Sequence, residues 1–120
     1  MINGKMPYRK TLHIRKPSAG WDYFTDDRVD PNYVIAYTHI AFINNTRNMD
    51  EVRIGCGYGR LYHWWEQELD PLADVLYWTN EEYWLTAGEQ LVVGMDGGNA
   101  NDNVRIYLEG FLYEDPPREG

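Results

Sequence analysis

Cysteine is almost absent from this chain, because Cys56 is the single cysteine among 120 residues. One cysteine excludes a disulfide framework within the chain, and it also excludes a structural zinc site built from several thiolates. The first seven residues include a basic residue but no apolar stretch follows them, so we expect no secretory signal peptide. We therefore expect a protein that folds in a reducing compartment or that never enters a secretion route.

Long apolar runs and common catalytic motifs are also missing. No stretch approaches the roughly 20 apolar residues that are required to cross a bilayer, so we expect no membrane partner. The chain has no Gly-x-Ser-x-Gly turn, no phosphate-binding loop and no dinucleotide fingerprint. The spaced glycines Gly55, Gly57 and Gly59 are not followed by a helical pattern and suggest a bulge or close packing within a strand. We expect no enzyme activity and no cofactor.

Lysine is scarce and is confined to one end of the chain. All three lysines lie among the first sixteen residues, which contain no acidic residue, while the rest of the chain holds all 19 Asp and Glu. Because an acidic body repels nucleic acid, we expect it to make no direct contact with nucleic acid. The basic segment instead predicts an arm that docks onto another protein, through Lys5, Arg9, Lys10, Arg15 and Lys16.

Aromatic residues are abundant, with five Trp, ten Tyr and three Phe. Many rings in short apolar runs are typical of β-structure. Strands are predicted over 11–16, 33–43, 51–57, 60–65, 75–79, 83–85, 90–95 and 104–113. Turns are predicted at 17–20, 86–89 and 96–103, with an acidic loop at 22–32. A short helix over 64–73 is an alternative, although Pro71 would end it early.

Seven or eight short strands with no persuasive helix predict an all-β fold, a single β-sandwich of jelly-roll type. We assign residues 1–16 to an extended basic N-terminal arm, 17–115 to the β-sandwich domain and 116–120 to a short tail. Strict alternation along the strand over 33–43 places five side chains on one face, namely Val34, Ala36, Thr38, Ile40 and Phe42.

Aromatic side chains in the middle of the chain are the main candidate binding residues. If Trp64 and Trp65 lie on a strand, they point to opposite faces. Part of this group would fill the core, and the exposed part would serve either a protein–protein interface or a platform on which sugars stack. The interface or glycan-stacking candidates are Tyr62, Trp64, Trp65, Trp78 and Trp84.

Titratable residues give weaker indications of a catalytic or metal site. His13, His39 and His63 lie in separate predicted strands, and Cys56 on an apolar strand face is more typical of a core residue than of a nucleophile. Asp96 and Asp102 in the loop at 96–103 are weak calcium candidates, but their spacing does not match an EF-hand loop. Acidic pairs along the chain favour a solvated acidic face over the two flanking carboxylates of a glycosidase.

Five motifs in order resemble the small jelly-roll structural proteins of tailed bacteriophage virions, of the decoration, head-fibre or head–tail accessory type. The motifs are Pro17-Ser18-Ala19-Gly20, Ile43-Asn44-Asn45-Thr46, Val52-Arg53-Ile54-Gly55, the segment 85–91 and the segment 103–114.

This resemblance implies a non-catalytic structural component of a bacteriophage particle, located in the virion. Such a decoration or accessory subunit docks to capsid or tail proteins through its arm and sheet edges, and it is usually a homo-oligomer. The alternative is a carbohydrate-binding β-sandwich module or receptor-binding tip, in which exposed Trp and Tyr side chains bind a glycan.

Overall fold

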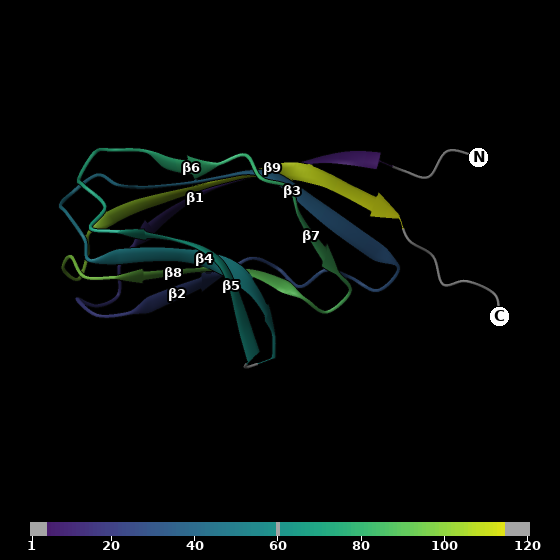
Figure 1. The fold of residues 1–120 in the computed structure, drawn as a ribbon, viewed down its shortest axis with the longest axis horizontal. Coiled ribbons are helices and arrows are strands. Elements are labelled where there is room, and N and C mark those ends of the chain that lie inside the picture. Colours follow the sequence, from purple (N-terminus) through teal and green to yellow (C-terminus); the bar gives the residue numbers. More distant parts are fainter. Residues whose placement is uncertain (1–4, 60, 115–120) are drawn as a thin grey trace.

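The computed structural model describes residues 5–59 and 61–114 (Figure 1). These residues contain no helix that is long and apolar enough to cross a membrane. Nine strands are found in the described part of the chain: β1 (Lys5–Arg15), β2 (Asp22–Thr25), β3 (Tyr33–Asn44), β4 (Glu51–Tyr58), β5 (Leu61–Leu69), β6 (Tyr77–Thr79), β7 (Tyr83–Thr86), β8 (Gln90–Asp96) and β9 (Asn103–Glu114).

The strands form two antiparallel sheets that pack face to face (Figure 1). Sheet A has the order β1-β9-β3, followed by β6 and β7, which both pair with β3. Sheet B has the order β2-β8-β4-β5. Most connections cross from one sheet to the other, and each sheet combines strands from both ends of the chain, which is the arrangement of a jelly roll. The predicted all-β jelly-roll sandwich is confirmed.

Strands β6 and β7 act as one interrupted edge strand beside β3. β7 pairs with residues 34–37 of β3, and β6 pairs with residues 40–42. Between these segments the β3–β9 register shifts, because Tyr37 pairs with Gly110 and His39 pairs with Glu109, which leaves Thr38 as the extra residue of a β-bulge. The predicted strict alternation is therefore wrong beyond Thr38, since a bulge moves later side chains to the opposite face.

The core lies between the sheets and is built from alternate side chains of the long strands. Fully buried residues such as Leu91 and Val93 from β8 face Ile106 and Leu108 from β9. Burying each such side chain contributes about 1.5–3 kcal/mol to folding. Because these inner positions alternate with outward positions, the same strands also determine which side chains lie on the outer faces.

The extended arm that the sequence predicted for residues 1–16 is wrong for residues 5–15. β1 pairs with β9 along its whole length, from Lys5 opposite Tyr113 to Arg15 opposite Asn103. Leu12 and Ile14 pack against the core, so the strand gains both ladder hydrogen bonds and apolar burial. Residues 1–4 of the predicted arm and residues 116–120 of the predicted tail lie outside the described residues.

Two other sequence-based expectations are also corrected. Part of the predicted acidic loop forms β2, in which Phe24 packs against the core while Tyr23 faces outward. The alternative helix over 64–73 does not form, because β5 continues to Leu69 as a partner of β4. In both cases pairing with a long neighbouring strand outweighs the local preference of polar residues.

Candidate binding surfaces

The outer face of sheet A carries five aromatic rings, of which two are exposed and three are half-buried. We name it the sheet A aromatic face, and strand register places on it Trp78, Trp84, Tyr107, Phe111 and Tyr113. The rings of Trp84 and Tyr113 stack with centroids 5.4 Å apart, and Phe111 lies beside Tyr113. Trp78 and Trp84 are 60% and 52% exposed, so the chain itself leaves much of both indole surfaces uncovered.

Small residues beneath these rings allow the rings to lie close to the sheet. Ala36 and Ala41 point outward from β3, yet both are 1% exposed. Ala36 pairs with Phe111 on one side and with Trp84 on the other, so its methyl group lies between two large rings. At one edge of this face the ammonium group of Lys5 lies 4.2 Å from the centroid of the Phe111 ring, a cation–π contact.

The outer face of sheet B carries a second group of rings, on the opposite side of the sandwich. We name it the sheet B aromatic face, and its members are Trp21, Tyr23, Tyr62 and Trp64. Tyr23 contacts the other three, with ring centroids 5.9 Å from Trp21, 5.8 Å from Tyr62 and 6.2 Å from Trp64. The planes of Tyr23 and Trp21 differ by 11°, so these rings are nearly parallel.

Glycine makes this second face possible. A Cβ atom at Gly94 would lie 3.2 Å from Tyr23 and 3.3 Å from Trp64, so the two rings meet directly above this glycine. They reach Gly94 from β2 and β5, the two edges of sheet B. The guanidinium group of Arg53 lies 4.8 Å from the centroid of Trp21 and supplies a hydrogen-bond donor beside the rings.

The structure distributes the five aromatic residues that the sequence suggested as binding candidates over three places. Tyr62 and Trp64 belong to the sheet B aromatic face, while Trp78 and Trp84 belong to the sheet A aromatic face. Trp65 lies between the sheets, where its ring stacks on Tyr83 with centroids 4.3 Å apart. Trp64 and Trp65 therefore point to opposite sides, as predicted.

Sequence reasoning missed several residues of both aromatic faces. Tyr23 was assigned to the acidic loop at 22–32 and Trp21, just before this loop, was given no role, although their alternation with Asp22 and Phe24 is a strand pattern that could have revealed them. Alternation along β9 places Tyr107, Phe111 and Tyr113 on one side of their strand, but only the fold shows that Trp84 joins them.

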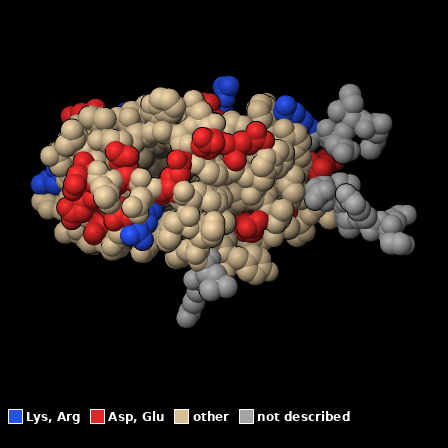
Figure 2. Space-filling model, viewed as in Figure 1, with Lys and Arg blue, Asp and Glu red and all other residues tan. Residues whose placement is uncertain are grey.

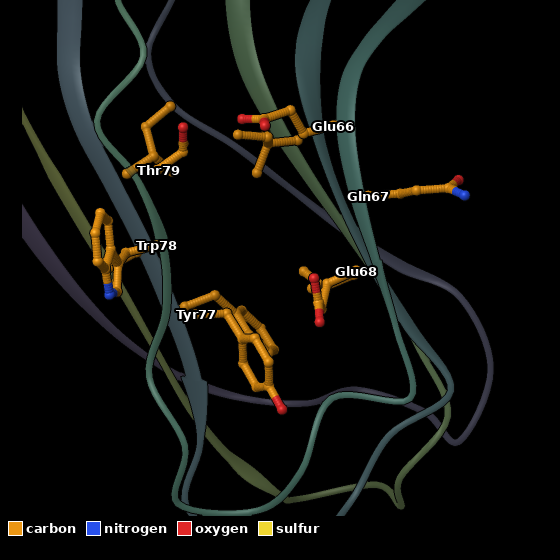
Figure 3. A pocket seen from close by; sticks show the side chains of 11 residues that line it. Glu66, Gln67, Glu68, Tyr77, Trp78 and Thr79 are labelled. Carbon is orange, nitrogen blue, oxygen red and sulfur yellow. The ribbon is translucent and has the colours of Figure 1, made fainter.

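A groove lies between β5 and β6, where the two sheets separate at one edge of the sandwich. It has a volume of about 130 Å³, and residues of the apolar core, including Phe42 and Ile54, form its floor. Figure 3 shows Glu66 and Glu68 pointing from β5 towards the groove, whereas Gln67 points away from it. The groove therefore combines an apolar floor with an acidic rim.

A bulge in β5 gives the groove its acidic rim. The β4–β5 register shifts between Ile54 opposite Glu66 and Gly55 opposite Trp64, which leaves Trp65 as the extra residue. This extra residue turns Glu66 inward. The Glu66 carboxylate accepts a hydrogen bond from the Tyr83 hydroxyl, and burial together with this bond raises the pKa of Tyr83 to about 12.

The predicted docking cations of β1 and Lys16, which follows β1 directly, have different environments. Lys16 is fully buried, and its ammonium group donates to Asp22 at 2.8 Å and to the Ser18 carbonyl oxygen at 2.9 Å. Lys10 donates to Asp26 at 2.7 Å. Arg9 and Arg15 are exposed and form no ion pair among residues 5–59 and 61–114.

Asp26 is the centre of a buried polar network between β1, β2 and β3. Its carboxylate accepts hydrogen bonds from the Tyr8 hydroxyl at 2.6 Å, the Tyr37 hydroxyl at 2.7 Å and the Lys10 ammonium group. Burial by itself would raise the pKa of Asp26, but hydrogen bonds from Lys10, Tyr8 and Tyr37 outweigh burial, and its pKa lies below the usual range. This network fixes the β1 edge of the sandwich.

The titratable candidates do not assemble into a catalytic or metal site. His63 pairs across strands with Cys56, but burial and the nearby Glu89 carboxylate raise the pKa of the Cys56 thiol, the opposite of what a nucleophile requires. His39 lies on the other sheet and shares a hydrogen bond with Asn80. No group of three His, Cys, Asp or Glu among the described residues has metal-site geometry.

The two weak calcium candidates have different structural roles. Asp102 is 1% exposed, and its carboxylate accepts hydrogen bonds from the Arg47 guanidinium at 2.8 Å and from the Asn99 backbone N–H at 2.9 Å. These donors hold the loop before β9. Asp96 belongs to β8, where it is half-buried beside Glu51 of β4.

Comparison with known proteins finds no matching family model and no matching curated protein. Among solved structures, a chain from work on disulfide-linked pili of Bacillus endospore appendages is 12% identical, with a TM-score of 0.47, and the match covers 95% of this chain and 94% of that one. A chain from work on CBM4 structure and function is 13% identical, with a TM-score of 0.38, over 92% and 95% of the two chains.

A third solved structure, Eiger TNF from S. frugiperda, is 10% identical with a TM-score of 0.35, over 93% of this chain and 96% of that chain. At these identities and scores, the three likenesses assign no function to this chain.

Proposed function

We propose that the protein is a non-catalytic structural subunit of a bacteriophage particle, a decoration or accessory protein that docks onto capsid or tail proteins. The sheet A aromatic face is the docking surface. The observation that carries this proposal is the exposure of Trp78 and Trp84, each more than half uncovered on one face. Tryptophan is on average a highly buried residue, and it is strongly enriched among the residues that dominate binding energy at interfaces.

The surroundings of the two tryptophans also suit a protein interface. Their neighbours Phe111 and Tyr113 extend the apolar surface, and Lys5 and Arg9 lie at its border on β1. An apolar centre with charged residues at its rim is the usual anatomy of a binding interface. The phage setting is supported by the five ordered motifs in the sequence.

Incorporation into particles tests this proposal. Tagged wild-type protein is expressed in the host during phage production and is expected to sediment with the particles. The Trp78→Ser/Trp84→Ser variant is expected to stay in the soluble fraction, because its docking face has lost its two largest apolar contacts. The matched control is the Tyr58→Ser/Leu69→Ser variant, which removes two exposed apolar side chains away from sheet A and should incorporate normally.

Thermal unfolding of the purified variants shows whether each one is folded. A wild-type protein that remains wholly in the soluble fraction would exclude the structural role in a particle. Equal incorporation of both variants would instead show that the sheet A aromatic face is not the docking surface.

A second candidate function is the binding of a glycan on the sheet B aromatic face. The specific observation is that Tyr23 and Trp64 meet above Gly94, which places two rings from opposite edges beside one another on the sheet. Aromatic rings offer apolar faces on which sugar rings stack, and Arg53 beside them can donate hydrogen bonds to hydroxyl groups.

A glycan panel tests the second candidate. Binding by the wild type should be lost in the Trp64→Ala variant and retained in the Trp84→Ala variant, which removes an equally large ring from the other sheet. Absence of binding by the wild type to any glycan in a broad panel would remove this candidate.

A further inference from the structure

Charge is segregated between the two long edges of the sandwich. One edge contains β5, β6 and β7 with their connections. Residues 61–86, which form this edge, include no Lys or Arg and six acids, namely Glu66, Glu68, Asp70, Asp74, Glu81 and Glu82. We name it the acidic edge. None of these acids forms an ion pair within the part of the chain that the structure describes. Figure 2 shows Asp and Glu gathered over one face, with few Lys or Arg among them.

The opposite edge contains β1 and β2, and we name it the basic edge. β1 is the outermost strand of sheet A on this side, as β2 is of sheet B. Residues 5–30, which include both strands, hold six Lys and Arg against four Asp. Arg9 and Arg15 of β1 are exposed, whereas Lys10 and Lys16 are held by intramolecular ion pairs. The two arginines are therefore cations that a partner can reach, as are Lys5 and Arg28, which are also exposed and form no ion pair among the described residues.

The groove at the acidic edge has the chemistry of a site for an arginine side chain. Its floor is apolar, and the carboxylates of Glu66 and Glu68 point towards it from β5 (Figure 3). Arginine combines an apolar stem, which covers hydrophobic surface, with a planar guanidinium group that binds carboxylates in a bidentate way. Tyr77 and Thr79 add polar atoms on the β6 side of the same groove.

We infer that the basic edge of one copy of this chain binds the acidic edge of a second copy, with Arg9 or Arg15 of one copy in the groove between β5 and β6 of the other. The inference deepens the proposed function, on which it rests for its setting in an assembled particle. Complementary charge favours this encounter, whereas two like edges would repel each other.

The two edges are different surfaces on opposite sides of one molecule, so the contact is heterologous. Such a contact leaves one unused edge on each end of a dimer, and further copies can add until the assembly closes into a ring or continues as a chain. β1 and β5 are also free of strand partners on their outer sides among the described residues. The approach of one edge to the other is therefore not blocked by another strand of the sheet.

Complementary edge variants test this inference by sedimentation velocity. The first variant, Arg9→Gln/Arg15→Gln, removes the two arginine charges of the basic edge and leaves the acidic edge intact. The second, Glu66→Gln/Glu68→Gln, removes the two carboxylates of the groove and leaves the basic edge intact. Wild-type protein at low ionic strength should self-associate with concentration, and each variant alone should have a dissociation constant raised by about tenfold or more. A mixture of the two variants should form a dimer that contains one copy of each and should not grow further.

Two controls make the result specific. Asp96→Lys reverses an acid on β8, an inner strand of sheet B outside both edges, and should associate as the wild type does. Raising the salt to about 0.5 M should dissociate the wild type without any substitution, because exposed charges are then strongly screened. This second measurement does not depend on whether a variant folds.

The outcomes separate the inference from the proposed function. Wild-type protein that stays monomeric up to about 100 μM at low salt, association that either variant retains, or a mixture that stays monomeric would each overturn the inference. Incorporation into particles is measured independently, so a monomeric protein that still incorporates would leave the proposed function intact. A protein that self-associates as described but never enters particles would retain the inference and contradict the proposed function.

Discussion

Replacing Asp26 with alanine should destabilise the protein by about 3–4 kcal/mol, because a buried charge partner is removed from an intact network. Asp26 is 1% exposed and accepts three side-chain hydrogen bonds, from Tyr8, Tyr37 and Lys10. Without it, the Tyr37 hydroxyl stays buried with no acceptor, at a cost of about 1–3 kcal/mol. Lys10 is one-third exposed and can turn to water or to Asp27, so the free energy lost at its ammonium group is smaller.

Urea unfolding at neutral pH measures this effect as a change in midpoint at constant slope. Asp27→Ala is the matched control, since Asp27 is 92% exposed and its ion pair with Lys10 should be worth less than about 1 kcal/mol. Combining Asp26→Ala with Tyr37→Phe should cost less than the sum of the two single changes, because Phe leaves no unpaired hydroxyl. An Asp26→Ala variant within about 1 kcal/mol of wild type would contradict this stabilising role of the Asp26 network.

The same network predicts how acid affects stability. The pKa of Asp26 is lower in the folded protein than the usual value of about 3.9, and the pKa values of Asp22 and Asp102 are lowered by hydrogen bonds that outweigh their burial. The unfolded chain therefore binds protons first as the pH falls. The stabilising contribution of these three groups is fully present above about pH 4 and is lost as the pH falls through their folded pKa values. Asp26→Ala should show a smaller acid-induced loss than wild type.

Three further predictions concern the close approach of β9 to β3 at Gly110, the ring stack between the sheets and the reactivity of the Cys56 thiol. Gly110→Ala should destabilise the fold by more than about 2 kcal/mol in urea, because its Cβ would lie 2.0 Å from the Ala36 carbonyl oxygen; an equal midpoint would contradict the bulge geometry. Trp65→Ala should cost about 3 kcal/mol and remove the near-ultraviolet dichroism of the ring stack. Cys56 should react with a disulfide reagent at pH 8 about tenfold more slowly than free cysteine, since the pKa of its thiol is raised.

The long strands could be predicted because their side chains alternate clearly. The strands expected over 33–43 and 104–113 match β3 and β9 within one or two residues. The turn before β8 was also predictable, since Gly88 adopts a φ of 85°, a conformation that glycine tolerates without strain. The local sequence pattern was sufficient to predict a strand wherever one strand face is apolar and a turn-forming residue ends the strand.

The remaining features depend on pairing between distant segments. β1 contains four cations and no acid, so its sequence resembles an arm until β9 is placed beside it. The bulges at Thr38 and Trp65 carry no local signal, yet they decide which later side chains turn inward. Strand pairing likewise separates Trp64 from Trp84 onto opposite faces, and no spacing along the chain could reveal this.

Tryptophan oxidation in the free protein and in purified particles, measured by hydroxyl-radical footprinting and mass spectrometry, tests most directly whether the sheet A aromatic face docks onto the particle. We expect Trp78 and Trp84 to be oxidised readily in the free protein and to be protected in particles, while Trp65, which is stacked between the sheets, should react slowly in both. Equal oxidation of Trp78 and Trp84 in the two states, or the absence of the protein from particles, would contradict the proposed docking role.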